Sequence, residues 1–217
     1  KADVAFVFAR TGKKHSAFLV EKGATGMSHV KPFEKLGFRG SELGGIVFKD
    51  CRVPSENLVG EEGKGFTYAK LMLNSGRITI AAMAVGIASA AYEKSLRFAA
   101  ERVQFKRPIA DFQLIQGKLA DMQTRITASR LMAYHTANLK DRGKFYAPEA
   151  SQAKLLASEA ALYVCDEAIQ IHGARGYVDQ WDVHRHWRDA KLMTIGEGTS
   201  EIMRKLIAKF ALKRVKK

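Results

Sequence analysis

The pattern of hydrophobic positions changes character near residue 60. Before that point, short runs rich in β-branched and aromatic residues read VAFVFA at 4–9, SAFLV at 16–20 and GGIVFKDCRV at 44–53, and such runs predict strands. The six residues RTGKKH between the first two runs have the composition of a hairpin loop, and the glycine-punctuated stretch over 32–44 predicts a long connection. We therefore expect a β-rich segment over residues 1–62.

From Gly65 onward the hydrophobic positions recur with a helical period. The helix predicted over 66–101 is alanine-rich, and its small residues recur every three or four positions, which permits close helix packing. Pro108 interrupts this pattern. Further helices are predicted over 112–141, 148–172, 182–192 and 199–212.

Long helices joined by short breaks predict an antiparallel bundle of about four helices. The fold class is therefore α+β, a β-rich N-terminal segment followed by an antiparallel four-helix bundle. The sequence GEEGKGF marks the boundary between a domain over 1–62 and a domain over 63–217.

The composition is that of a protein with a packed core. The chain has 217 residues, of which 47% are hydrophobic, and this content excludes wholesale disorder. No apolar run reaches the roughly 18 residues of a membrane span, and no signal peptide opens the chain. The opening KADVAFVFAR reads as mid-domain strand sequence, so we expect a fragment whose N-terminal portion is absent.

Cysteine and histidine usage argues against a disulfide and against a metal. The two cysteines are Cys51 and Cys165, with no CxxC motif, which favours a reducing compartment. His172, His184 and His186 lack the spacing of metal ligands. We interpret these histidines as structural and expect no metal site.

The formal net charge of +14 favours anionic partners, such as nucleic acid, a membrane surface or a phosphate-bearing cofactor. Apart from the C-terminal KFALKRVKK, however, the basic residues are dispersed through the helical patterns. Nucleic-acid binding favours a basic stripe on one face, so we do not expect a nucleic-acid partner. A solvated surface accounts for the charge equally well.

The stretch IGEGTSEIMR at 195–204 contains the main candidate for chemistry. Glu197 lies between two glycines, which remove side-chain cover and let other groups approach the backbone. Burial would raise the pKa of such a carboxyl and suit it to proton transfer near neutral pH. A structural alternative is a capping box formed by Thr194 and Glu197 at a helix start. The local pattern leaves both interpretations open.

Four motifs together resemble the acyl-CoA dehydrogenase family. They are VPSENLVGEEGKGF, ERVQFKRPIADFQ, AIQIHGARGY and WRDAKLMTIGEGTSEI, in this order and spacing, and the resemblance runs from residue 1 to about residue 210. It implies the later part of the family's middle β domain followed by its complete C-terminal four-helix domain. It also implies an FAD enzyme that oxidises an acyl-CoA thioester to the trans-2-enoyl-CoA.

In that reaction a carboxylate removes the α proton while the β hydrogen leaves as hydride to flavin N5. The resemblance implies that Glu197 is this base. Some family members carry the base on the first long helix instead, where this chain has Gly76, which supports Glu197 and argues against the isovaleryl-CoA dehydrogenase type. The resemblance further implies substrate-binding roles for Arg77, Gly198 and Ser41. An ion pair is the alternative for Arg77, and an ordinary loop position is the alternative for Ser41.

The resemblance assigns the cofactor-binding residues to several helix ends, and some of them reach the FAD of a neighbouring subunit. These residues are Arg102, Gln113, Gln170, Gly173, Ala174, Thr199 and Glu201. The structural alternatives are a helix-end cation at Arg102, a helix C-cap at Gly173 and an ion pair between Glu201 and Lys205.

Two departures from the family pattern are expected to weaken FAD affinity. Ala174 replaces the second glycine of HGGxGY, and Lys106 stands where glycine is common. The upstream strands that flank the flavin in this family are also absent here, so we expect this fragment by itself to bind FAD poorly and to be inactive.

The family resemblance implies a homo-oligomer, a dimer or tetramer, and electron transfer to an electron-transfer flavoprotein. It implies a cytoplasmic location, or the mitochondrial matrix in a eukaryote. Three alternatives stay open: a nucleic-acid-binding relative of the family, a glutaryl-CoA-type decarboxylating dehydrogenase, and an oxidase that passes electrons to oxygen.

Overall fold

The computed structural model describes residues 2–215, except for the side chain of Arg214. The chain divides into two compact units. The first comprises Lys1–Lys35 and Arg39–Leu73, and the second comprises Leu36–Phe38 and Asn74–Lys217. A β-rich segment followed by a helical region, as the sequence predicts, is confirmed.

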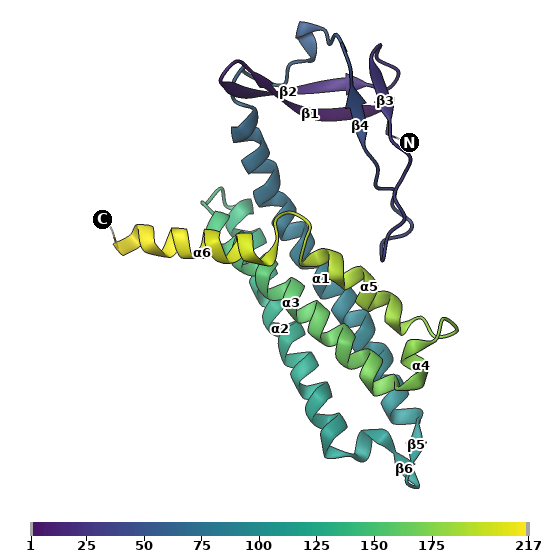
Figure 1. The fold of residues 1–217 in the computed structure, drawn as a ribbon. Helices are drawn as coiled ribbons and strands as arrows, with labels where there is room; N and C mark the ends of the chain where they lie inside the picture. The colour runs from purple at the N-terminus through teal and green to yellow at the C-terminus, as the bar shows by residue number, and fades with distance from the viewer. Residues whose placement is uncertain (1, 216–217) are drawn as a thin grey trace. The chain divides into compact units, whose positions relative to one another are not determined.

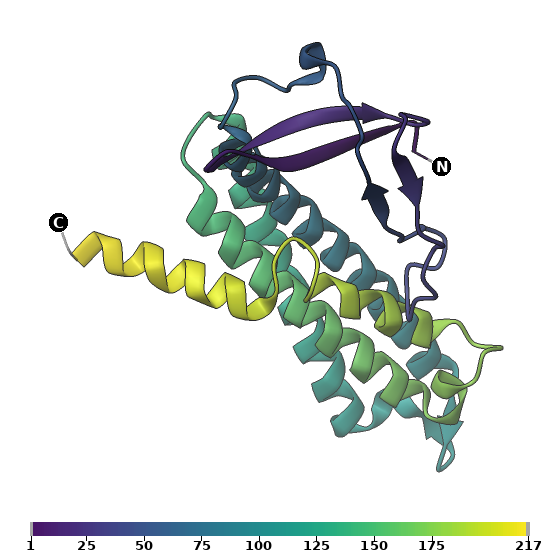
Figure 2. The same ribbon diagram turned by 45° about the horizontal axis from the view of Figure 1, so that its top comes forward.

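The first unit is built on an antiparallel hairpin (Figure 2). Strand β1, Val4–Thr11, pairs with β2, Lys14–Glu21. Gly12 begins the connecting turn with φ of +57°, a left-handed conformation that glycine adopts without steric cost. The turn is therefore shorter than the six-residue loop expected from the sequence, because the flanking polar residues continue the two strands.

A second, shorter pair joins β3, Met27–His29, to β4, Ile46–Phe48. The strand predicted over 44–53 is thus mostly wrong, because Asp50 has φ of +50° and cannot continue a ladder. Strand β3 was not predicted, since three residues carry no readable alternation. The residues between β3 and β4 lack a helix or strand, as expected for the long connection, and a short 3₁₀ turn, η1, follows at Ser55–Asn57.

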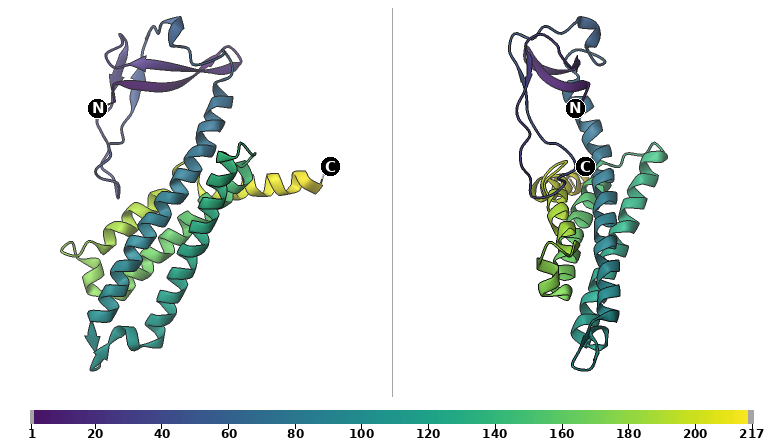
Figure 3. Two further views of the ribbon diagram at one scale, coloured as in Figure 1. Left: turned by 180° about the vertical axis from the view of Figure 1, so that it is seen from behind. Right: turned by 90° about the vertical axis from the view of Figure 1, so that its right-hand side faces the viewer.

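The second unit is helical, and its predicted helices are confirmed to within a few residues. Three long helices lie side by side (Figure 3), with a shorter helix packed against the third and a last helix that crosses it (Figure 1). The helices are α1 (Gly65–Glu101), α2 (Gln113–Asp141), α3 (Ala147–His172), α4 (Ala174–Tyr177), α5 (Val183–Met193) and α6 (Ser200–Val215).

The connection from α1 to α2 contains a small hairpin that the sequence pattern did not reveal. Strand β5, Val103–Gln104, pairs with β6, Arg107–Pro108, and the 3₁₀ turn η2, Ile109–Asp111, follows. Phe105 and Lys106 form its turn with φ of +50° and +67°. Lys106 therefore occupies a left-handed position that suits glycine better.

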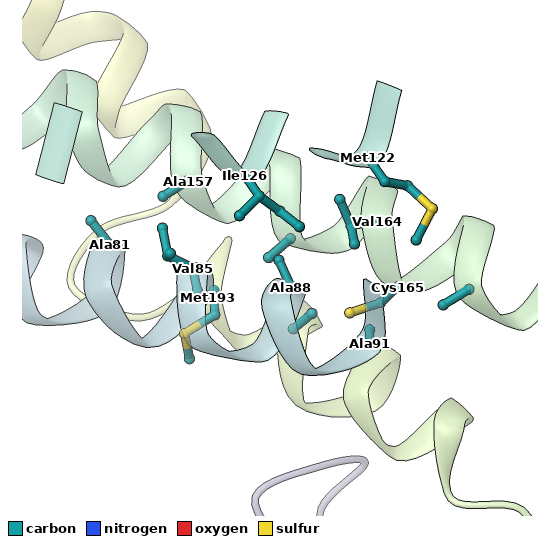
Figure 4. Close-up of a cluster of buried hydrophobic side chains, with 14 of the residues drawn as sticks. Ala81, Val85, Ala88, Ala91, Met122, Ile126, Ala157, Val164, Cys165 and Met193 are labelled. Carbon is teal, nitrogen blue, oxygen red and sulfur yellow. The ribbon is translucent and has the colours of Figure 1, made fainter. Parts of the chain in front are cut away.

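The core of the second unit is made largely of small side chains (Figure 4). Alanines of α1 and α3 let these helices approach closely, and larger side chains from α2 and α5 fill the remaining space. The labelled core residues include Ala81, Ala88, Met122, Ile126, Ala157, Val164 and Met193. Cys165 lies in the same core, where burial raises the pKa of its thiol to about 12.

Both cysteines are free, in agreement with the sequence analysis. Within residues 2–215, no group of three or more metal-type side chains is arranged to hold an ion. Helix α1 is long and apolar enough to cross a membrane by length and composition alone, but a core helix of a soluble protein passes the same test. Since α1 supplies core alanines, this is weak evidence for a span.

Ile126 tests the tightness of this core. It is 2% exposed, so Ile126→Ala should lower the free energy of unfolding by about 2–5 kcal/mol and Ile126→Val by about 0.5–1.5 kcal/mol. Denaturant unfolding monitored by circular dichroism measures both variants. Equal losses for the two variants would contradict the packed core.

Candidate active site

The loop between α5 and α6 carries Glu197. The Thr194 hydroxyl donates to the carbonyl of Lys191 at 2.9 Å, and α6 begins only at Ser200. The capping box of Thr194 and Glu197 is therefore not formed. Instead, Thr199 caps α6, because its Oγ1 accepts a hydrogen bond from the backbone N–H of Ile202 at 3.4 Å.

Glu197 and Gly198 are both in the left-handed region, with φ of +55° and +104°. For a glutamate this conformation costs roughly 1–2 kcal/mol, and such strain concentrates at functional sites. L side chains rarely adopt the backbone conformation of Gly198, so this position favours glycine. The two residues together turn the chain sharply before α6.

The carboxylate of Glu197 lies against Gly76 of α1. A Cβ built on Gly76 would be 2.8 Å from both Cδ and Oε2 of Glu197. The missing side chain at position 76 thus provides the space that the carboxylate occupies. Position 76 is the helix position at which the sequence analysis expects the base of some members of the resembled family.

Arg77, the next residue on α1, is buried and binds the loop that carries Glu197. It is 7% exposed, its Nε donates to the backbone carbonyl of Glu197 at 3.4 Å, and its Nη1 donates to Oδ1 of Asn74 at 2.8 Å. Burial lowers the pKa of the guanidinium, and the charge of Glu197 partly offsets this. Arg77 is therefore not a surface ion pair, while an ion pair within the helical unit remains the alternative to a substrate role.

Lys154 is a buried cation that the sequence analysis missed. Its side chain is 0% exposed, and its Nζ has no hydrogen-bond partner among the described residues. Burial lowers the pKa of the amine to about 8, with a further lowering by Arg77 and opposing effects of Glu159, Glu201 and Glu197. A readable signal existed, since Lys154 interrupts the alanine face formed by Ala150 and Ala157.

A pocket of about 670 Å³ opens beside this loop, between α3, α5 and α6. Thr199 and Glu201, both predicted to bind cofactor, line it. Its other walls include the aromatic rings of Tyr163 and Trp187 and the cation of Lys191. Flat, hydrogen-bonding ligands suit such a lining.

The first turn of α6 adds polar groups to this pocket. Its own backbone amide and the Thr199 hydroxyl hold the pKa of Glu201 below its ordinary value, assisted by the charges of Arg204 and Lys191. The expected alternative, an ion pair with Lys205, is not among these causes. Ser200 Oγ is buried without a hydrogen-bond partner among the described residues.

The other predicted cofactor residues gather at the opposite end of the helices. The stacked rings of Phe98 and His172, with centroids 4.4 Å apart, join the end of α1 to the end of α3. Arg102 follows Phe98 by one turn and is half-buried, and Gln113 begins α2 with an exposed side chain. The exposed Gln170 lies in the last turn of α3.

Gly173 ends α3 with φ of +58°, and its N–H donates to the carbonyl of Gln170 at 3.2 Å. Gly173 is therefore the C-cap of α3. This structural role does not exclude a contact of Gly173 with a ligand. Ala174, the first residue of α4, is exposed, so its methyl group adds bulk on the outer surface.

These two groups of residues are far apart within one chain. The part of α1 that separates Arg77 from Arg102 is about 37 Å long at roughly 1.5 Å per residue.

Asp189 connects the WRDAKL motif to the segment Leu36–Phe38. Its Oδ1 accepts a hydrogen bond from the backbone N–H of Phe38 at 2.6 Å. Ser41 belongs to the first unit, where its carbonyl accepts a hydrogen bond from Lys35. A substrate role for Ser41 stays a prediction.

Comparison with known proteins gives consistent matches over this chain. A family model described as acyl-CoA dehydrogenase, C-terminal domain, matches residues 63–212. A protein named probable acyl-CoA dehydrogenase YngJ, from Bacillus subtilis (strain 168), is 48% identical over 218 residues, which cover 98% of this chain and 57% of that protein. The chain therefore spans about half the length of the relatives it matches.

Solved structures agree. Butyryl-CoA dehydrogenase from Megasphaera elsdenii matches with a TM-score of 0.95 at 42% identity, over 97% of this chain and 56% of that one. Acyl-CoA dehydrogenase complexed with FAD from Bacillus anthracis matches with a TM-score of 0.93 at 36% identity, over 99% of this chain and 40% of that one.

These matches show that the chain has the acyl-CoA dehydrogenase fold. The chain belongs to the acyl-CoA dehydrogenase family, as the four sequence motifs predicted.

The buried amine gives a pH dependence of stability. Because the pKa of Lys154 falls from 10.5 to about 8 on folding, the unfolded chain holds a proton between these values that the folded chain has released. The free energy of unfolding should therefore rise with pH across this window. Denaturant unfolding at several pH values between 8 and 10.5 measures the rise.

Lys154→Met should remove this contribution, whereas Lys205→Met, at an exposed position of α6, should keep it. A Lys154→Met variant that follows the parent across the whole window would show that the amine titrates normally.

Proposed function

We propose that this chain supplies the base and part of the cofactor site of an FAD-dependent acyl-CoA dehydrogenase. The activity is α,β-dehydrogenation of an acyl-CoA thioester to the trans-2-enoyl-CoA, with Glu197 as the base. One observation carries this proposal: a strained left-handed turn places the Glu197 carboxylate in the space left by Gly76. A glutamate that only capped a helix would not need this conformation.

The chain's own residues account for the proton transfer. The α proton leaves carbon for the Glu197 carboxylate, which becomes a neutral acid. Arg77 holds the loop by its bond to the Glu197 carbonyl, so the carboxylate keeps its direction during the transfer. Gly198 leaves the backbone uncovered beside it, which suits close approach of a thioester. When bound, FAD would supply the acceptor for the β hydrogen, which leaves as hydride.

The donor set around the 670 Å³ pocket fits the adenosine end of FAD. The Glu201 carboxylate would accept hydrogen bonds from ribose hydroxyls or the adenine amino group, and the Thr199 hydroxyl would bond to a ribose or phosphate oxygen. Arg102 and Gln113, with Gln170 and the backbone at Gly173 and Ala174, offer a second set of contacts, in which arginine suits pyrophosphate.

Because about 37 Å of helix separates Arg77 from Arg102, we propose that the second set binds the FAD of another subunit. Self-association of this kind would also cover apolar side chains that α2 exposes. Leu114, Leu131 and Tyr134 are 85%, 65% and 69% exposed, and exposed apolar faces mark contact surfaces. We propose a dimer or tetramer built through a four-helix bundle over 63–217, preceded by part of a β domain over 1–62.

Electron-transfer flavoprotein is the proposed electron acceptor. Reoxidation of the reduced flavin by air as fast as by that protein would favour the oxidase alternative instead. Release of carbon dioxide from glutaryl-CoA would favour the decarboxylating type. Retention of the Glu197 geometry favours an enzyme over a nucleic-acid-binding relative, which steeply salt-dependent DNA binding would reveal.

Glu197→Gln tests the base. In the FAD-loaded protein, the rate of flavin bleaching on mixing with acyl-CoA substrates should fall by roughly 10²–10⁴-fold, because an amide does not accept the α proton. Glu93→Gln, at an exposed acid of α1, is the matched control and should bleach at the parent rate. Bleaching of Glu197→Gln at the parent rate refutes the assignment.

Gly76→Ala tests the space that the carboxylate occupies. The new methyl group would displace the Glu197 carboxylate, so bleaching should slow by at least tenfold while the fold persists. Gly86→Ala lies in the same helix with nothing within 4 Å of the new Cβ, and should raise the free energy of unfolding by about 0.8–1.0 kcal/mol at unchanged activity. Equal bleaching rates in the two variants would contradict the contact.

A further inference from the structure

Asn74 is a polar residue in the interior of a helix that would be more stable without it. It lies within α1, Gly65–Glu101, and asparagine is a poorer helix former than alanine because its side chain competes for backbone hydrogen bonds. The side chain is half-buried, so contact with water does not by itself account for an amide at this place. A residue that costs helix stability here calls for another role.

The hydrogen bond that the structure gives Asn74 goes to Arg77. Its Oδ1 accepts from Nη1 of the guanidinium at 2.8 Å. The two residues lie three positions apart, a spacing that places their side chains on one face of the helix. A guanidinium carries donors and no acceptor, so it is the oxygen of the amide that faces it.

Arg77 in turn binds the loop that carries Glu197, by a longer hydrogen bond. Its Nε donates to the backbone carbonyl of Glu197 at 3.4 Å, which is long for a bond of this kind. The arginine side chain has many rotamers, and a small rotation of the guanidinium would break so long a bond. The shorter contact with Asn74 restrains the guanidinium and keeps Nε directed at the carbonyl.

The carbonyl at the end of this chain of contacts belongs to a strained residue. Glu197 has φ of +55°, and such a conformation persists only where its surroundings hold it in place. The carboxylate of the same residue lies against Gly76. Relaxation of the turn would therefore move the carboxylate away from this place.

We propose that Asn74 is a positioning residue for the base, because it orients Arg77 and thereby holds the turn at Glu197. This inference rests on the proposed function. Asn74 transfers no proton and touches no reacting atom. It acts through two successive hydrogen bonds, from Nη1 of Arg77 to Asn74 and from Nε of Arg77 to the carbonyl of Glu197. Catalytic groups need support of this kind, since their geometry depends on neighbours that lock their conformation.

A neighbouring hydrogen bond provides a matched control. Ser75, the next residue of α1, shares a hydrogen bond of 3.2 Å with the hydroxyl of Tyr146. Tyr146→Phe removes a side-chain hydrogen bond from the same turn of α1 and leaves the contact between Asn74 and Arg77 in place. This variant separates a loosened helix turn from a misdirected arginine.

The first measurement needs no turnover. A glutamate-specific protease cleaves after Glu197 when the turn opens, and mass spectrometry gives the rate at which the FAD-loaded protein yields the fragment that ends there. Asn74→Ala should raise this rate by about 2- to 12-fold, as expected for the loss of one hydrogen bond. Alanine is the better helix former, so a weaker helix would not explain the rise. Asn74→Asp keeps an acceptor of the same shape and should cleave at the parent rate, as should Tyr146→Phe.

The second measurement is the rate of flavin bleaching in a single turnover, at varied concentrations of acyl-CoA. Asn74→Ala should lower the rate at saturation by at least about twofold, because fewer molecules hold the carboxylate in place. The half-saturating concentration should stay unchanged, since Asn74 does not bind the substrate. Asn74→Asp should recover the parent rate.

Three results would overturn the inference. They are an unchanged saturated rate in Asn74→Ala, whether or not cleavage rises, a higher half-saturating concentration as the main effect, and equal losses in Tyr146→Phe and Asn74→Ala. Glu197→Gln, measured alongside, separates these failures from that of the proposed function. An inactive Glu197→Gln with a parent-like Asn74→Ala rejects only the positioning role, and an active Glu197→Gln rejects the base itself.

Discussion

The site depends on one steric relation, a carboxylate that occupies the place of a missing side chain. Glu197 fits against α1 only because position 76 is glycine, and its side chain reaches that place only because two consecutive residues adopt left-handed backbone conformations. The bond from Arg77 to the Glu197 carbonyl then fixes the turn. Small side chains also allow the helices to approach closely, since alanines on α1 and α3 let the two backbones lie near each other.

The interior of the helical unit combines this small-residue packing with two buried cations. Two long cationic side chains, Arg77 and Lys154, are buried in this unit. Burying a charge is costly unless an opposite charge or hydrogen bonds compensate it. The opposite end of the helices is joined both by the Phe98–His172 stack and by the ion pair of Lys94 with Asp182.

The helices were predictable because their signals are local and repeated. Pro148 lies in the first turn of α3 and Gly173 closes it, and each boundary was readable from residue type alone. Strand β3 was not, since it is three residues long and depends on a partner distant in sequence. Strand β4 lies within the strand predicted over 44–53 but is much shorter. The hairpin at β5 and β6 was missed because its turn residues, Phe105 and Lys106, adopt left-handed conformations. Neither phenylalanine nor lysine is typical of such a turn, so the sequence pattern contained no sign of it.

For the site, the sequence identified positions 197 and 76 as the two possible places for the base. It did not predict that the two residues are in contact, because residues 121 positions apart in sequence meet only when the chain has folded. Lys154 was missed because lysines usually lie on surfaces. The capping-box alternative was readable from Thr194 and Glu197, and the start of α6 at Ser200 excluded it.

The contact between Glu197 and Gly76 also bears on how such proteins diverge. A side chain at position 76 and the Glu197 carboxylate compete for the same space. The residue tolerated at either position therefore depends on the residue at the other, although the two are far apart in the sequence.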